Sequence, residues 1–244
     1  MKLYVKFLKN EIKPWRKKMW CIPPKENAEF VCNMEDVLDV YKLPYDSDYP
    51  LICMDETSKQ LTKETRKAIK AKPGEIEKFD YEYERNGVAN IFMFFEPLTG
   101  WSNIEITNSR TMIDWAHCIK ELVDVHYPNA KNILLVCDNL NTHKGASLYK
   151  TFPPDEAKRI LKKLVFHYTP KHGSWLNIAE LMLSIYTRQC MDRRIADKET
   201  LETETNAWLE NRNKNNIKVN WQFTTENARK NSKILPINTI LTLH

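Results

Sequence analysis

Two aspartates, Asp55 and Asp138, each follow directly after an apolar run that is typical of a buried strand, at residues 51–54 and 132–137. If the two runs are neighbouring parallel strands, both carboxylates lie at one edge of a sheet, where open α/β sheets place ligand sites. Two ionised carboxylates held together repel one another unless a cation lies between them, which favours a Mg²⁺ site. The alternative at each position is an ordinary turn residue or helix cap, and the residues alone leave this open.

A third carboxylate, Glu180, lies about two turns into a helix that we expect to begin at Ser174, a residue type that favours N-caps. On that helix, Glu180 shares a polar stripe with Asn177, Ser184 and Thr187. Glu180 can therefore complete a set of three metal-binding carboxylates. The alternative is an exposed glutamate on a solvated stripe, and the spacing taken alone favours it.

The apolar periodicity predicts the elements that must position these carboxylates. We expect strands at residues 51–54, 88–95, 101–107, 132–137 and 165–168. We expect helices at residues 34–41, 112–126, 155–164, 174–190 and 198–212. Residues 57–80 and 211–220 read as loops, and Asn86-Gly87 is a hairpin-turn signal.

The order of these elements predicts the fold class. The first three strands are joined by short turns and can pair antiparallel, whereas the later strands need helical crossovers and pair parallel. A mixed sheet flanked by helices follows, in the order of a ribonuclease H-like α/β fold.

Composition narrows the class of protein. The chain has 244 residues, a net charge of +5 and 42% hydrophobic residues, which fits one large domain or one domain with extensions. No apolar run is long enough for a transmembrane helix, and the charged first residues do not fit a signal peptide, so we expect a cytoplasmic protein without a membrane partner. The basic segments KPWRKK and KETRKAIKAK can bind a phosphate backbone, or can be solvated faces.

Several common sites are not supported by the sequence. The six cysteines form no CxxC pair, and the spacing of His143, His167 and His172 matches no common zinc signature. Neither GxxxxGK nor GxGxxG occurs, so nucleotide-binding loops are not indicated. A dehalogenase-type phosphohydrolase is disfavoured because the segment after the first strand lacks the second aspartate of a DxD motif.

Three segments carry a family resemblance: LICMDETSKQL, LVCDNLNTHKGASLY and HYTPKHGSWLNIAE. In this order they resemble the catalytic blocks of insertion-sequence DDE transposases, in the bacterial branch of the Tc/mariner superfamily. The segments KPWRKKMWCIPP, ANIFMFFEPLTGW, IDWAHCIKELVD, RQCMDRRI and WQFTTENAR also resemble family segments, so the similarity extends over nearly the whole chain.

The resemblance implies roles for individual residues. Asp55, Asp138 and Glu180 match the catalytic metal-binding triad of the family, with two Mg²⁺ or Mn²⁺ ions per site. The implied reaction is phosphoryl transfer, in which water attacks a phosphodiester at the element's end and the freed 3′-OH attacks target DNA at a TA step. Residues expected to support the site or contact DNA are Glu56, Asn141, His143, His172, Trp175 and Asn177. Residues expected to contact the DNA backbone are Arg16, Lys17, Lys18, Lys171 and Arg188.

The resemblance also divides the chain. It implies an N-terminal linker or arm at 1–48, a ribonuclease H-like DDE catalytic core at 49–192 and a C-terminal helical extension at 193–244. Relatives carry helix-turn-helix modules upstream of such an arm, and we expect that this chain lacks them. The arm resembles a linker that joins subunits, which implies a homodimer on double-stranded DNA, associated with the bacterial nucleoid when bound.

Two alternatives remain open. A chain without end-recognition modules can be a catalytically silent DNA-binding or dimerising remnant of a transposase. A non-transposase nuclease on the same fold is the other alternative, which the segments HGSWLNIAE and DNLNTH make less favoured.

Overall fold

The computed structural model describes residues 28–231 apart from 67–68, 77 and 79. The basic residues Arg16, Lys17 and Lys18 and the segment WRKKMWCIPP therefore lie outside the described residues. The strands are β1 (Leu51–Glu64), β2 (Tyr83–Phe95), β3 (Ser102–Thr107), β4 (Ile133–Cys137) and β5 (Leu164–Tyr168). The α-helices are α2 (Ala28–Val40), α3 (Met112–Glu121), α4 (Gly145–Thr151), α5 (Pro154–Lys162), α6 (Ile178–Tyr186), α7 (Lys198–Asn215) and α8 (Thr225–Asn231). Shorter helical turns are η1 (Leu122–His126), η2 (Ser174–Leu176) and η3 (Thr187–Met191).

The five strands form one mixed sheet in the order β3-β2-β1-β4-β5. The pairs β1–β2 and β2–β3 are antiparallel, whereas β1–β4 and β4–β5 are parallel. This arrangement confirms the predicted mixed sheet, because the first three strands follow one another through turns and the last two enter after helices.

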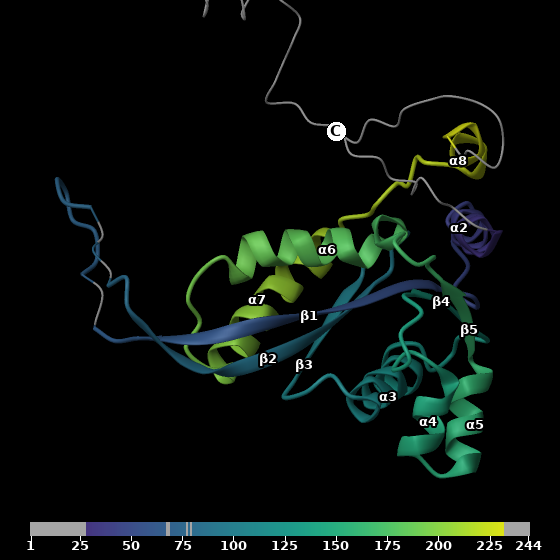
Figure 1. Ribbon diagram of the computed structural model, residues 1–244, viewed down its shortest axis with the longest axis horizontal. Helices are drawn as coiled ribbons and strands as arrows, with labels where there is room; N and C mark the ends of the chain where they lie inside the picture. The colour runs from purple at the N-terminus through teal and green to yellow at the C-terminus, as the bar shows by residue number, and fades with distance from the viewer. Residues whose placement is uncertain (1–27, 67–68, 77, 79, 232–244) are drawn as a thin grey trace, which may run out of the picture.

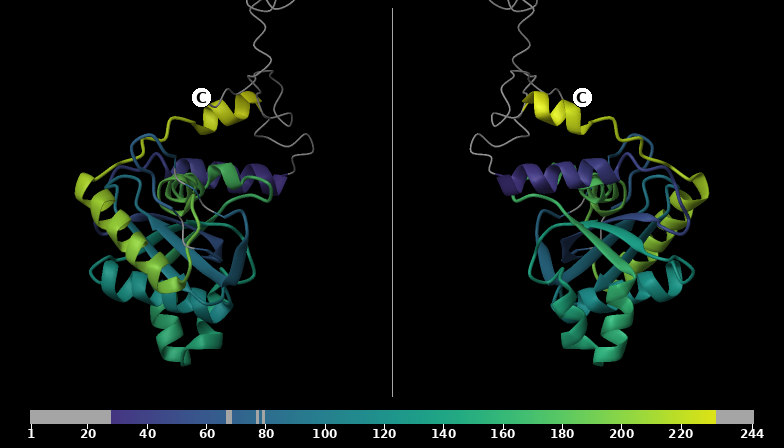
Figure 2. Two further views of the ribbon diagram at one scale, coloured as in Figure 1. Left: turned by 90° about the vertical axis from the view of Figure 1, so that its left-hand side faces the viewer. Right: turned by 90° about the vertical axis from the view of Figure 1, so that its right-hand side faces the viewer.

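Helices cover both faces of the sheet and form two separate hydrophobic clusters (Figures 1 and 2). The side chains of β1 alternate between them: Leu51 and Cys53 join the cluster that includes α2, α6 and α7. Ile52 and Met54 join the cluster that includes α3, α4 and α5. Because β1 is buried on both faces from Leu51 to Met54, the stretch just before Asp55 is fixed from both sides.

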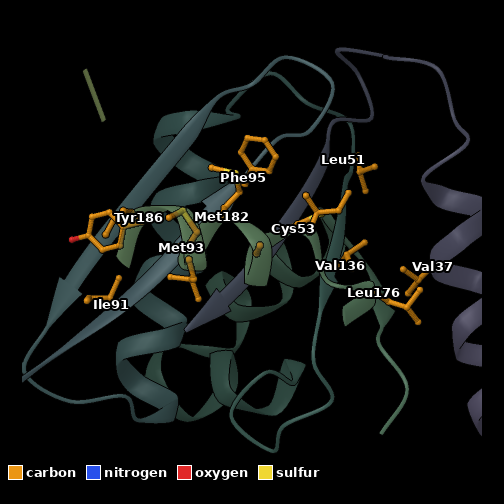
Figure 3. Packing of buried hydrophobic residues seen from close by; sticks show 14 of the residues in the cluster. Val37, Leu51, Cys53, Ile91, Met93, Phe95, Val136, Leu176, Met182 and Tyr186 are labelled. Atoms are coloured by element: carbon orange, nitrogen blue, oxygen red, sulfur yellow. The ribbon is translucent and has the colours of Figure 1, made fainter. Parts of the chain in front are cut away.

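Helix α6 lies across one face of the sheet. Its residues Met182 and Tyr186 are fully buried and share a cluster with Cys53, Met93 and Phe95 of the strands (Figure 3). This apolar face fixes the rotation of α6 about its axis, and so determines which side its polar residues occupy.

The helices before and after the predicted core pack into the same cluster. Val37 of α2 packs near Leu176 of η2 (Figure 3), and the side-chain amide of Asn213 in α7 exchanges two hydrogen bonds with the backbone of Ser102 in β3. The division at residues 48 and 192 stays a prediction.

The first hairpin differs from the prediction. Strand β1 continues to Glu64, so residues 57–64 are strand and not loop, and the β1–β2 hairpin extends well beyond the layers (Figure 1). Asn86 and Gly87 lie inside β2 and form no hairpin turn; the register of the two strands shifts between Gln60 and Thr62, and Gly87 has a φ of 90°. Residues 57–61 alternate between at least partly buried and exposed positions, but Leu61 is the one apolar side chain among them, so the sequence carries no apolar alternation, and cross-strand hydrogen bonds hold the ribbon together.

Other boundaries also differ. Helices α4 and α8 were not predicted, and α7 continues to Asn215 into the segment predicted as a loop. The helix expected to begin at Ser174 is a single 3₁₀ turn there, and α6 begins after an N-cap at Asn177. Among the described residues, no helix is long and apolar enough to cross a membrane.

Candidate active site

Asp55 and Asp138 extend from two neighbouring parallel strands. Cys53 of β1 pairs with Val136 of β4, and each aspartate lies two residues beyond its member of that pair. Asp55 is partly buried, and the side chain of Asp138 is 37% exposed. The register therefore places both carboxylates just beyond the β1–β4 ladder, as predicted, but Asp55 lies inside β1 and not at the strand end that the apolar run predicts.

Glu180 is exposed in the first turn of α6, whose start is tied to β1 by Asn177. The Oδ1 atom of Asn177 accepts a hydrogen bond of 3.1 Å from the backbone N–H of Ala179, which caps the helix. The Nδ2 atom of Asn177 donates a hydrogen bond of 2.9 Å to the carbonyl of Met54, the residue before Asp55. The turn that carries Glu180 is thus attached to the part of β1 that carries Asp55.

The electrostatics of Asp55 connect the three carboxylates. Burial raises the pKa of Asp55 to about 7, and the charges of Glu56, Asp138 and Glu180 add to this rise. A hydrogen bond of 2.8 Å from the backbone N–H of Glu56 to Asp55 Oδ1 opposes it. The charges of both Asp138 and Glu180 therefore act on Asp55, which places the three carboxylates in one acidic region.

A buried histidine joins two acidic residues beside this site. His143 is 1% exposed, its Nδ1 is in hydrogen-bonding contact with Asp138 Oδ1, and its Nε2 lies 3.0 Å from Glu56 Oε2. Burial alone lowers the pKa of His143, but its contacts with Asp138 and Glu56 outweigh burial and raise the pKa to about 9. At neutral pH the ring is therefore an imidazolium held between two carboxylates.

The closest group of possible metal ligands differs from the predicted triad. Within the described part of the chain, Glu56, Asp138 and His143 form a group whose ligand atoms all lie within 4.8 Å of one another, and Asp55 and Glu180 are not in it. A protonated imidazole has no free lone pair for a metal. We therefore interpret this group as a hydrogen-bonded support for Asp138.

The aromatic surroundings of His143 were missed by sequence reasoning. The Trp115 ring stacks on the His143 ring at a centroid distance of 5.7 Å, and the Tyr168 hydroxyl donates a hydrogen bond of 3.0 Å to the His143 carbonyl. Periodicity marks Trp115 only as a core residue of α3, so no local signal connects it to the site.

Among the described residues, three others that the sequence assigned to the site, Asn141, His172 and Trp175, make no hydrogen bond, ion pair or ring contact with the three carboxylates. Asn141 is exposed and accepts a hydrogen bond of 3.3 Å from Lys144, and His172 is exposed with a φ of 65°. Trp175 is half-buried, and its ring packs edge-on against Phe223 at 5.4 Å. These contacts assign no chemistry to the three residues.

A comparison with protein families identifies the family of the chain. A family model described as DDE superfamily endonuclease matches residues 50–202, which include all three carboxylates. The chain belongs to this family. The predicted membership in the DDE group is thereby confirmed.

Solved structures similar to this DDE endonuclease chain show the same fold. The Mos1 mariner paired-end complex with Mn matches with a TM-score of 0.55 and 12% identity, over 86% of this chain and 63% of that chain. The Mos1 strand transfer complex matches with a TM-score of 0.53 and 12% identity, over 86% and 62% of the two chains. The mariner Mos1 paired-end complex with Mg matches with a TM-score of 0.51 and 13% identity, over 85% and 62%.

These likenesses confirm the ribonuclease H-like fold of the DDE core. The chain spans slightly less than two thirds of the length of the Mos1 chains. No curated protein sequence matches it.

Proposed function

We propose that this chain is the catalytic domain of a DNA transposase, which cleaves DNA strands and transfers them to a target with the help of divalent cations. The observation that carries the proposal is the register of β1 and β4, with Asp55 and Asp138 at equivalent positions beyond the Cys53–Val136 pair. Family membership supports it, because DDE endonucleases are the group in which such carboxylates are expected to act together.

The donor set fits Mg²⁺ or Mn²⁺. Asp55, Asp138 and Glu180 offer only carboxylate oxygens, the ligands that these hard cations prefer. The raised pKa of Asp55 reflects burial and repulsion by neighbouring carboxylates, and a cation would relieve this repulsion. When bound, a pair of such ions supplies activation of the attacking oxygen and stabilisation of the leaving oxygen.

The protonation of Asp55 and the contacts of His143 determine whether these carboxylates are available to bind a cation. Asp55 has to lose its proton before it can act as a ligand, and its pKa of about 7 places this step near neutral pH. The His143 imidazolium holds Asp138 Oδ1 and leaves the other oxygen of that carboxylate without a contact to the ring. His143 also balances the charge of Glu56, so that two further carboxylates can lie beside it.

The proposed partner is double-stranded DNA, as transposon ends and as a target, with a TA step as the target site. The Mos1 structures are paired-end and strand transfer complexes, which supports this choice. We further propose a homodimer on DNA, two ions per site, and a bacterial cytoplasmic protein that associates with the nucleoid when bound. Lys171 and Arg188 are exposed and are proposed to contact the DNA backbone.

The test is Mn²⁺-dependent nicking of duplex DNA by the purified full chain, compared with Asp138→Asn. We expect the wild type to nick and Asp138→Asn to lose nearly all activity. The matched control is Asp155→Asn, which changes an exposed carboxylate on α5 and should nick like the wild type. Equal nicking by the wild type and Asp138→Asn would contradict the proposed function.

A further inference from the structure

Asn177 lies between β1, which carries Asp55, and α6, which carries Glu180. It is 3% exposed, and its backbone and side chain make contacts to both elements. Its side chain bonds Met54 of β1 and Ala179 of α6, and its carbonyl accepts a hydrogen bond of 3.0 Å from the backbone N–H of Glu180. One buried residue therefore contacts the neighbour of Asp55 and the backbone of Glu180 itself.

We propose that Asn177 is a positioning residue for divalent-cation binding: its side-chain amide sets the placement of Glu180 relative to Asp55. This inference rests on the proposed function, and it assigns to Asn177 a role other than contact with DNA. Asn177 acts through the two carboxylates and touches neither cation nor substrate.

The geometry of β1 explains why such a link is needed. The parallel ladder between β1 and β4 ends at the pair Cys53 and Val136, so β1 loses its β4 neighbour just before Asp55 and continues paired with β2 alone on that stretch. The Asn177 amide bonds the Met54 carbonyl at this point. The apolar packing of α6 sets which face of the helix meets the sheet, whereas this directional hydrogen bond fixes the start of the helix relative to Met54 of β1.

A second buried residue, Tyr41, holds the same turn and contacts β1 through the Cys53 thiol, which lies 3.6 Å from its hydroxyl. The Tyr41 hydroxyl donates a hydrogen bond of 2.7 Å to the carbonyl of Leu176, and the backbone N–H of Ile178 donates to the Tyr41 oxygen at 3.4 Å. Tyr41 thus fixes the backbone on both sides of Asn177. The part left to the Asn177 side chain is the connection from this turn to the residue before Asp55.

The asparagine side chain can cap α6 and bond to β1 at the same time. Its oxygen accepts from the helix N–H and its nitrogen donates to a carbonyl. Serine or threonine can accept from the helix N–H as an N-cap, but the side chain is too short to donate to Met54 as well. These substitutions therefore separate capping of α6 from the connection to β1.

The experiment measures the Kd for Mn²⁺ by calorimetry on the full chain, and the melting temperature without metal. The variants are Asn177→Ser, which keeps the cap, and Asn177→Ala, which loses both hydrogen bonds. We expect both variants to bind Mn²⁺ at least about tenfold more weakly than the wild type, as for other residues that orient metal ligands. Asn177→Thr replaces the serine variant if that variant does not fold.

The matched control is Asp197→Ala, which removes the N-cap of α7 by deleting the hydrogen bond of 2.8 Å from the Thr200 N–H. It should lower the melting temperature and leave the Kd for Mn²⁺ unchanged. Wild-type Mn²⁺ affinity in folded Asn177→Ser or Asn177→Thr would overturn the positioning role. Equal Mn²⁺ binding by the wild type and Asp138→Asn would instead show that the proposed function is wrong.

Discussion

The His143 ring lies against the Asp138 carboxylate, with Nδ1 in hydrogen-bonding contact with Oδ1. The opposite ring nitrogen lies 3.0 Å from Glu56, and the ring is 1% exposed beneath the stacked indole of Trp115. The buried His143 imidazolium thus provides a positive charge beside the acidic residues of the site. This relationship explains how Glu56 can be buried beside Asp55 and Asp138.

Replacing His143 by glutamine should destabilise the protein by about 2–4 kcal/mol at pH 6. This is below the range of about 3–5 kcal/mol for fully buried pairs, because Asp138 is 37% exposed. The pKa of His143 is raised from 6.5 to about 9, so its contribution is fully present below pH 6.5 and is lost as the pH rises through 9.

Denaturant unfolding at pH 6 and pH 10 measures this effect. The free-energy difference between the wild type and His143→Gln should be smaller at pH 10. His117→Gln, which changes an exposed histidine on α3, serves as the control and should show little difference at either pH. An identical loss for His143→Gln at both pH values would indicate that packing, and not charge, is responsible.

Asp55→Asn should stabilise the metal-free protein at pH 8 by about 1–3 kcal/mol. The folded state raises the pKa of Asp55 from 3.8 to about 7, so it binds a proton more tightly than the unfolded state. The contribution of Asp55 to the free energy of unfolding therefore falls as the pH rises from about 4 to 7, and it stays reduced above pH 7. The expected value is less than the full shift of about three units implies, because Asp55 is only partly buried.

Thermal unfolding in the presence of a chelator, at pH 4 and pH 8, measures this gain. Asp55→Asn should melt above the wild type at pH 8 and close to it at pH 4. Asp155→Asn should melt like the wild type at both values. A lower melting temperature for Asp55→Asn at pH 8 would contradict the electrostatic account of the site.

The sequence predicts that Asp55 and Asp138 lie on neighbouring parallel strands, but it does not predict that β1 continues beyond Asp55 or which residues support the site. Asp55 and Asp138 are predictable because each ends a short apolar run, and the order of turns and crossovers makes the two strands neighbours. The contact of His143 with Glu56 joins two distant segments, and no spacing within either segment encodes it. Such contacts depend on how α3, β1 and the loop after β4 pack together.

Local signals also mislead where two of them compete. Ser174 is a favourable N-cap residue, but the chain makes a single 3₁₀ turn there. Asn177 caps α6 instead, and its side-chain amide also donates a hydrogen bond to the Met54 carbonyl. In the hairpin, Asn86 and Gly87 carry a turn signal but lie within β2, since pairing with β1 continues past them. In both cases a contact from outside the segment decides the local structure.

Gly100→Ala should lower the free energy of unfolding by at least about 3 kcal/mol. Gly100 has a φ of 84°, and an added Cβ would lie 2.7 Å from the carbonyl carbon of Asn216. The matched control is Gly74→Ala, which has the same φ, and no atom of the residues that the structure describes lies within 4 Å of the added Cβ. Its cost should be the conformational strain alone, about 1–2 kcal/mol.

Chemical denaturation of both variants measures the difference. A Gly100→Ala cost equal to that of Gly74→Ala would mean that the segment after α7 moves away from residue 100 without penalty. The turn after β2 would then not depend on its close contact with Asn216.

The double variant Lys171→Ala, Arg188→Ala should reduce the salt dependence of DNA binding. Each lost phosphate contact lowers the slope of log Kd against log salt concentration by about 0.9 for duplex DNA, so two contacts should lower it by about 1.8. Fluorescence anisotropy with a duplex over a range of NaCl concentrations measures this slope. The matched control is Lys158→Ala, Lys162→Ala, which removes two exposed charges from α5, on the face of the sheet opposite to α6 (Figure 1). The same reduction in both double variants would show that net charge, and not contact near the acidic site, sets the affinity.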